Sequence, residues 1–168
     1  MVETEVRTRS VAIEGVTLGL WLGAIAIPLL VSGPQLLVGS IVNCLLFLSS
    51  TRLDGRRLIL MAVLPSLAAV GHGVLFGGLT AYLIYLLPFI WAGNLMLMII
   101  FKGLLGKWMG IGGVLAASMV KAGWLFLAAL FLAYLKVIPM AMVGLMGFAQ
   151  LVTALIGGAG VLVVTKRK

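Results

Sequence analysis

Three long stretches of this sequence carry no charged residue, and they decide what the chain can fold into. They run from Gly15 to Thr51, from Leu58 to Phe101 and from Val137 to Thr165, and comprise 37, 44 and 29 residues. One transmembrane helix needs about 20 apolar residues. No stretch alternates apolar and polar residues as the strands of a membrane barrel do. We therefore expect an all-α integral membrane protein in which residues 1–168 form a single domain.

Turn-forming residues divide the longest stretches into segments of spanning length. Hydrophobic residues make up 63% of the chain and charged residues 10%, too little polar surface for a soluble domain. The segments "SGPQ" at 32–35 and "FGGLT" at 76–80 are predicted turns. Pro28 and further apolar residues follow the first apolar run, so we expect this run to be retained as a membrane helix and not cleaved as a signal peptide. The result is a bundle of six transmembrane helices, at about 11–32, 35–50, 58–75, 79–101, 108–135 and 138–164.

The basic residues predict the orientation of these helices. Ten of the twelve lysines and arginines fall in the two termini and in the loops on the same side, whereas Lys136 falls in a loop on the other side and Lys121 within the fifth helix. Cytoplasmic loops are enriched in Lys and Arg. We expect a multi-pass protein of the cell membrane with a cytoplasmic N-terminus and C-terminus. The net charge of +8 then reflects membrane topology and not a nucleic-acid partner.

Residue sets for catalysis are sparse. The chain has one histidine, one cysteine and four acidic residues, so neither a metal site nor a carboxylate pair can be composed at membrane depth. The only Gly-Lys pair, in "GLLGKW", lacks the earlier glycine and the following Ser or Thr of a phosphate-binding loop. We expect no enzyme activity, no metal and no cofactor.

A few polar side chains fall at membrane depth and are the candidates for substrate binding. Lys121 stands out, because thirteen uncharged residues precede it and fourteen follow it, and a charge at the bilayer centre costs about 2.5–3.5 kcal/mol. No acidic residue is expected at its depth, which leaves ligand contact, a structural ion pair or a neutral lysine held by carbonyl groups as the alternatives. The further candidates are Asn43, His72, Tyr82, Trp124 and Gln150. Each also has a structural alternative, as an interhelical hydrogen bond, a loop residue or an interfacial aromatic.

Small residues form a stripe in each of two predicted helices. The stripe of the first helix consists of Ala12, Gly15, Gly19 and Gly23, and that of the sixth of Ala149, Thr153 and Gly157. Such a face lets another helix approach closely. Each stripe is therefore interpreted either as internal packing or as a docking face for a partner subunit.

Three segments give the chain a family resemblance. They are "LPFIWAGNLMLMIIFKGLLGK", "SMVKAGWLFL" and "GFAQLVTALIGG", in the fourth, fifth and sixth predicted helices. Together with six short helices and the stripe in the first one, they resemble the substrate-binding S components of energy-coupling factor (ECF) transporters, the vitamin-uptake systems of prokaryotes. The resemblance implies a high-affinity binding subunit of an ABC-type importer in a prokaryotic plasma membrane, which takes up a small water-soluble vitamin or related micronutrient.

The resemblance also implies partners and roles for residues. The partners would be a transmembrane coupling subunit and two cytoplasmic ATPases, with the coupling subunit docked on Ala12, Gly15, Gly19 and Gly23, where glycine stands at positions usually occupied by alanine. The ligand would lie in the region of His72, Tyr82, Lys121, Trp124 and Gln150, and a lone cation suits a ligand with an anionic group. Two alternatives stay open: a stand-alone small-molecule carrier or channel, and a structural subunit of a larger membrane enzyme.

Overall fold

The described part of the chain consists of helices joined by turns. The structure is a computed structural model that describes the backbone of residues 2–31, 34–73, 77–104 and 110–166. Within these ranges it describes the side chains of residues 14 to 164. No strand occurs in these ranges, so the all-α prediction is confirmed. The helices are α1 (Val2–Leu30), α2 (Gln35–Ser50), α3 (Gly55–His72), the 3₁₀ helix η1 (Gly77–Tyr82), α4 (Leu83–Leu104), α5 (Ile111–Tyr134), α6 (Ala141–Gly144), the π-helical turn η2 (Leu145–Ala149) and α7 (Gln150–Lys166). Among the described residues, three segments are long and apolar enough to cross a membrane: Gly77–Leu104, Ile111–Tyr134 and Ala141–Val164.

The first helix is longer than the sequence predicts. α1 begins at Val2, nine residues before the predicted start at 11. Its N-terminal segment is polar, but it contains neither Gly nor Pro before Gly15 and includes the good helix formers Glu and Arg. The prediction rested on apolar length, which marks the part of a helix suited to lipid and not its full extent.

The second predicted helix is found with its predicted bounds, as α2 (Gln35–Ser50), and the others have altered ends. The fourth is preceded by the 3₁₀ helix η1, and the sixth begins at Ala141 and is interrupted by the π turn η2. α3 begins at Gly55, three residues before its predicted start at 58. The predicted bounds at 32, 75 and 108 lie outside the described residues, as do residues 32–33 and 76 of the predicted turns.

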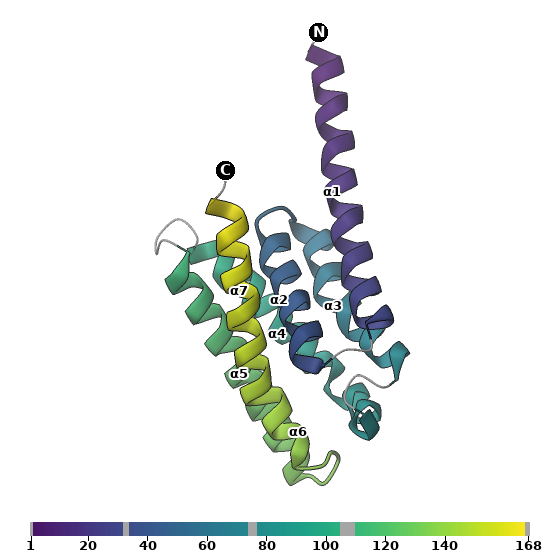
Figure 1. Ribbon diagram of the computed structural model, residues 1–168, viewed down its shortest axis with the longest axis vertical. Helices are drawn as coiled ribbons and strands as arrows, with labels where there is room; N and C mark the ends of the chain where they lie inside the picture. The colour runs from purple at the N-terminus through teal and green to yellow at the C-terminus, as the bar shows by residue number, and fades with distance from the viewer. Residues whose placement is uncertain (1, 32–33, 74–76, 105–109, 167–168) are drawn as a thin grey trace.

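The helices lie side by side, with α2 inside the bundle (Figure 1). α2 packs against α1, α3, α4 and α7, whereas α1 packs mainly against α3 and α2 and projects beyond the other helices. α1 begins and α7 ends at the same end of the bundle, which we call the terminal end; the turn between α2 and α3 also lies there. The turn between α5 and α6 lies at the opposite, distal end.

The outward faces of the helices are apolar. Leu22 on α1, Met119 and Leu127 on α5, and Phe148 on η2 expose 57%, 65%, 63% and 75% of their surface. Exposed apolar residues spread over every side of the bundle would favour aggregation in water, whereas hydrocarbon covers them at no cost. This surface fits a membrane protein, in agreement with the three spanning segments.

The interior consists of two apolar clusters at different heights. The terminal cluster includes Phe47 and Phe101, whose rings meet edge to face with centroids 4.8 Å apart. The distal cluster includes Leu86, Leu125 and Met142, all fully buried. Several buried polar side chains of α2 to α5 lie between the two clusters.

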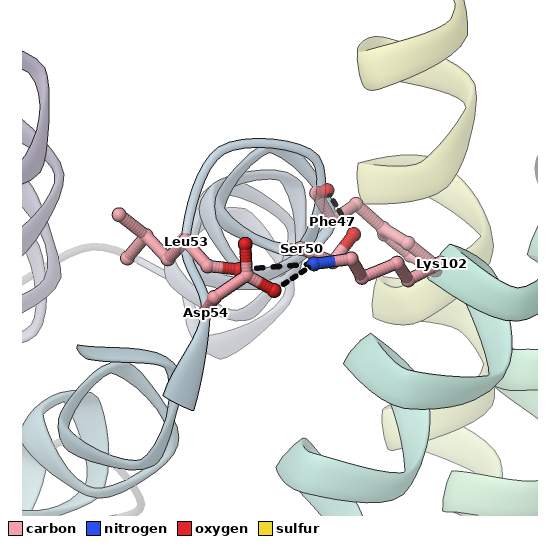
Figure 2. Close-up of polar contacts among 5 residues, drawn as sticks. All are labelled: Phe47, Ser50, Leu53, Asp54 and Lys102. Carbon is pink, nitrogen blue, oxygen red and sulfur yellow. Dashed lines mark hydrogen bonds and ion pairs between the residues drawn. The ribbon is translucent and has the colours of Figure 1, made fainter. Parts of the chain in front are cut away.

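An ion pair joins two elements at the terminal end. Lys102 of α4 pairs with Asp54, in the turn before α3, and its ammonium group also lies 3.4 Å from the carbonyl oxygen of Leu53 (Figure 2). Nearby, the Ser50 hydroxyl donates to the carbonyl oxygen of Phe47 at 2.6 Å. Asp54 is 85% exposed, and exposed pairs contribute only about 0–1 kcal/mol. The fold therefore depends little on this contact.

Glycines let α2 and α7 approach closely. A Cβ atom built at Gly157 would lie 2.6 Å from both the Ser40 carbonyl oxygen and the Cys44 backbone nitrogen, and one at Gly39 would lie 2.9 Å from Cγ2 of Thr153. Thr153 and Gly157 belong to the small-residue stripe predicted in the sixth helix. At these positions the stripe is internal packing.

Replacing Gly157 with Ala should lower the melting temperature of the purified protein in detergent. The added methyl group would meet backbone atoms of α2 at 2.6 Å, so the two helices must separate, at an overpacking cost of about 1–3 kcal/mol. Gly123→Ala on α5 is the matched control, because a Cβ atom there meets nothing within 4 Å. Equal melting temperatures for the two variants would contradict the close approach of α2 and α7.

Candidate functional site

A layer of polar side chains lies between the two apolar clusters. On α5, Lys121 follows Ala117 of the terminal cluster and precedes Leu125 of the distal one. On α4, Asn94 likewise lies between Leu86 of the distal cluster and Leu97 of the terminal cluster. The layer comprises Asn43, Ser66, Asn94, Ser118, Lys121 and Thr153, all buried. Four helices and α7 thus bring their polar groups to one level of the bundle.

A chain of hydrogen bonds links α5, α2 and α7 through this layer. The Lys121 ammonium group donates to Oδ1 of Asn43 at 2.6 Å. Nδ2 of Asn43 donates to the Thr153 hydroxyl at 3.1 Å and to the Gly39 carbonyl oxygen at 2.9 Å. The Thr153 hydroxyl in turn donates to the Gln150 carbonyl oxygen at 3.1 Å. Lys121 and Asn43 are only 3% and 1% exposed, so these bonds replace the water that both side chains lose.

The bonds leave hydrogen-bonding capacity unused near Lys121. An ammonium group has three donors, and one of them is taken by Asn43. Ser118, one helical turn from Lys121, is fully buried, and its hydroxyl has no hydrogen-bond partner among the described residues. Such groups are stabilised when a water molecule or a ligand supplies the missing partner.

A central cavity of about 80 Å³ opens at this layer. Every helix from α1 to α5 lines it, together with η2 and α7, and its polar lining residues are Gln35, Asn43, Ser66, Asn94, Lys121 and Gln150. No Asp or Glu lines it within the described residues, and no group of three or more potential metal ligands occurs in the same part of the chain. The cavity thus presents one amine and several amides without a counter-charge, which suits binding of an electron-rich group.

The structure brings together three of the six residues predicted to bind substrate. Lys121, Asn43 and Gln150 line the central cavity. Asn43 and Lys121 lie on different helices and are 78 residues apart in the sequence. Their similar predicted depth in the membrane was the only indication in the sequence that they are in contact.

The other three candidates lie toward the distal end, outside the lining of the cavity. Trp124 donates its indole N–H to the Phe89 carbonyl oxygen at 2.9 Å, and Tyr82 and Trp124 both pack against the distal cluster. His72 is the last residue of α3. Trp124 follows Lys121 by three positions, so the helical rise carries its ring one turn out of the polar layer.

Sequence reasoning named no substrate-binding residue among those that α3 and α4 contribute to the lining of the cavity. Pro65 lines the cavity and lacks the N–H group that would bond the Met61 carbonyl, which interrupts the helical ladder. At this level Asn94 of α4 donates to the Ala62 carbonyl oxygen at 2.8 Å. The Trp91 indole N–H donates to the Ser66 hydroxyl at 2.8 Å. A proline inside an apolar helix was the available signal.

No other helix of the described chain packs against most of the stripe predicted for partner docking. Gly15 and Gly19 are exposed, and Cβ atoms built there meet nothing within 4 Å. Gly23 is half-buried, and its Cβ would lie 3.3 Å from Cδ1 of Leu45. Ala12 belongs to α1, but its side chain lies outside those described. The exposed part of the stripe is accessible to another helix.

The hydrogen bond between Lys121 and Asn43 should appear as energetic coupling. Asn43→Leu leaves a buried amine without its acceptor and should destabilise the protein by about 2 kcal/mol. Lys121→Met removes the amine, so the double variant should be less destabilised than the sum of the single variants by about 1–2 kcal/mol. Denaturant unfolding in detergent micelles measures all three.

Asn94→Leu provides the matched control for this cycle. Asn94 also lines the cavity, but it bonds the Ala62 carbonyl and not Lys121. Its effect should therefore add to that of Lys121→Met. Additive effects for Asn43 as well would show that the bond contributes nothing to stability.

Comparisons of the chain with protein-family models, with curated protein sequences and with solved structures found no match. The functional interpretation therefore rests on the cavity, its lining and the charges of this chain.

Proposed function

We propose that the chain is the membrane-embedded substrate-binding S component of an ECF-type importer, which binds a small water-soluble vitamin or related micronutrient with an anionic group. The observation that carries this proposal is the amine of Lys121, 3% exposed, at a central cavity without a lining carboxylate among the described residues. Buried polar groups of this kind in membrane segments commonly mark substrate sites.

The charge of the ligand follows from the missing counter-charge. An ammonium group in a medium of low dielectric constant attracts an anion far more strongly than it does in water. Asn43 supplies only a neutral oxygen. A ligand carboxylate or phosphate would complete the charge pair, while the amides of Gln35 and Gln150 are available to its polar groups.

The size of the cavity limits what it holds in this conformation. Its volume of about 80 Å³ has room for a few water molecules, whereas pockets for drug-sized ligands measure about 300–1,000 Å³. Binding a vitamin-sized molecule therefore requires the surrounding helices to move apart.

The proposal includes six membrane-spanning helices with both termini in the cytoplasm. Among the described side chains, Arg52 lies in the turn between α2 and α3 and Arg56 and Arg57 at the start of α3, at the terminal end, where Lys102 pairs with Asp54. Lys136 lies in the turn between α5 and α6, at the distal end. This asymmetry supports a cytoplasmic terminal end. α2 has 16 residues and is about 24 Å long, less than the roughly 30 Å of a hydrocarbon core; its position among four neighbouring helices supports a buried span.

Lys121→Met should abolish retention of the ligand and leave a folded protein. The purified wild-type protein is extracted, and the small molecules released from it are identified by mass spectrometry. Lys102→Met is the control, because Lys102 lies outside the cavity and pairs with Asp54 at the surface. Equal amounts of the same small molecule in Lys121→Met and in the wild type would remove Lys121 from the site.

Gly19→Leu should spare ligand retention and disrupt assembly with the coupling subunit and ATPases. The leucine would project from an exposed position with nothing within 4 Å, so it blocks a neighbouring helix without disturbing the bundle. Affinity purification of the tagged chain from its native membrane, followed by mass spectrometry, measures assembly. Gly123→Leu is the control on another open face. If both variants retain the same partners, the stripe on α1 is not the docking face.

A further inference from the structure

The turn that ends α5 holds a lysine in a strained conformation. Lys136 has φ 59° and is the only residue other than glycine with a positive φ in the described chain. Its backbone N–H donates to the Ala133 carbonyl oxygen at 2.9 Å, and the N–H of Val137 donates to the Leu132 carbonyl oxygen at 3.0 Å. These two bonds form a Schellman motif, in which this position is usually glycine. A residue other than glycine in such a strained backbone conformation often marks a functional site.

The charge of Lys136 is isolated at the distal end. It is exposed, and the nearest charged residue along the chain is the buried Lys121. The turn lies at the end of the bundle opposite the turn between α2 and α3, which contains Arg52 and the partner of Lys102, Asp54. Within the described residues, no carboxylate forms an ion pair with Lys136. Its ammonium group is available to an anion from outside the chain.

An apolar groove on α5 ends at Tyr134 and Met140, on either side of the turn that carries this lysine. Its lining residues are Leu127, Leu130, Phe131, Tyr134 and Met140, around an open hollow of about 430 Å³. Tyr134, next to the turn, is 82% exposed, and tyrosines are enriched where a membrane meets water. α5 is one of the three segments able to span a membrane, so the groove faces lipid chains and the turn faces their headgroups.

We propose that the groove and Lys136 together form a binding site for one phospholipid with an anionic headgroup. An acyl chain lies along Leu127 and Phe131, and the phosphate contacts the Lys136 ammonium group beside the Tyr134 hydroxyl. A zwitterionic lipid carries its own cation and gains less from Lys136 than an anionic one. This inference is independent of the central cavity and of any transport role.

Photocrosslinking tests the site at the level of single peptides. The full-length protein in detergent is mixed with phosphatidylglycerol or phosphatidylcholine that carries a diazirine in the same acyl chain, and the labelled peptides are identified by mass spectrometry. One cation near a membrane surface favours an anionic lipid by about fivefold. We expect residues 127–140 to be labelled about fivefold more by phosphatidylglycerol.

Variants separate binding of the headgroup from effects on folding. Lys136→Gly should abolish the lipid preference and raise the melting temperature, because glycine relieves the strained backbone. Lys136→Gln should abolish the preference without that gain in stability, and Lys102→Gln at the opposite end should leave the labelling of residues 127–140 unchanged.

Three results would overturn the proposal. They are equal labelling of residues 127–140 by the two lipids in the wild type, a preference that survives both Lys136 variants, and a preference that falls equally in Lys102→Gln.

Discussion

The hydrogen bond between Lys121 and Asn43 sets the main constraint on this structure. An amine in the interior of an apolar bundle must find an acceptor, because water is excluded. The acceptor comes from α2 and is itself held by Thr153 of α7, so three helices must keep their heights relative to one another. A shift of one turn, about 5.4 Å, would leave the amine against the apolar cluster above or below it. The apolar clusters fill space on both sides, but the polar layer specifies the register.

Close packing of α2 and α7 makes that register possible. Asn43 reaches Thr153 at 3.1 Å because Gly39 and Gly157 allow the helices to approach on either side of it. The π turn η2 precedes this contact in the chain. Met146 within η2 and Gln150 directly after it both line the cavity. A π turn adds a residue to one turn of the helix and is frequent at functional sites. Here it lies where the segment from α6 to η2, whose Met142 and Met146 belong to the distal cluster, continues into α7, which contacts α2.

The parts of the fold that depend on local sequence could be predicted, and those that depend on neighbours could not. Uncharged length predicted the helices, and the uncharged residues flanking Lys121 predicted its burial. Depth suggested Asn43, whereas proximity to Lys121 along the helix suggested Trp124, which bonds the Phe89 carbonyl outside the polar layer. The contribution of Asn94 required knowing that α4 packs against the interrupted ladder of α3. Counting residues along a helix gives the depth of each side chain in the membrane. Which helices are neighbours depends on tertiary packing, which no single segment encodes.

The central position of Lys121 in α5 (Ile111–Tyr134) has an electrical consequence. A charge that crosses a whole membrane gains or loses about 2.3 kcal/mol per 100 mV, so a site near the middle is subject to about half of the membrane potential. In a cell with a negative interior, an anion that entered from the distal side would bind against about 1 kcal/mol per 100 mV. Detergent micelles impose no such voltage, so an affinity measured there would exceed the affinity in an energised membrane. The depth that isolates the amine from water would thus also expose a bound anion to the membrane potential of the cell.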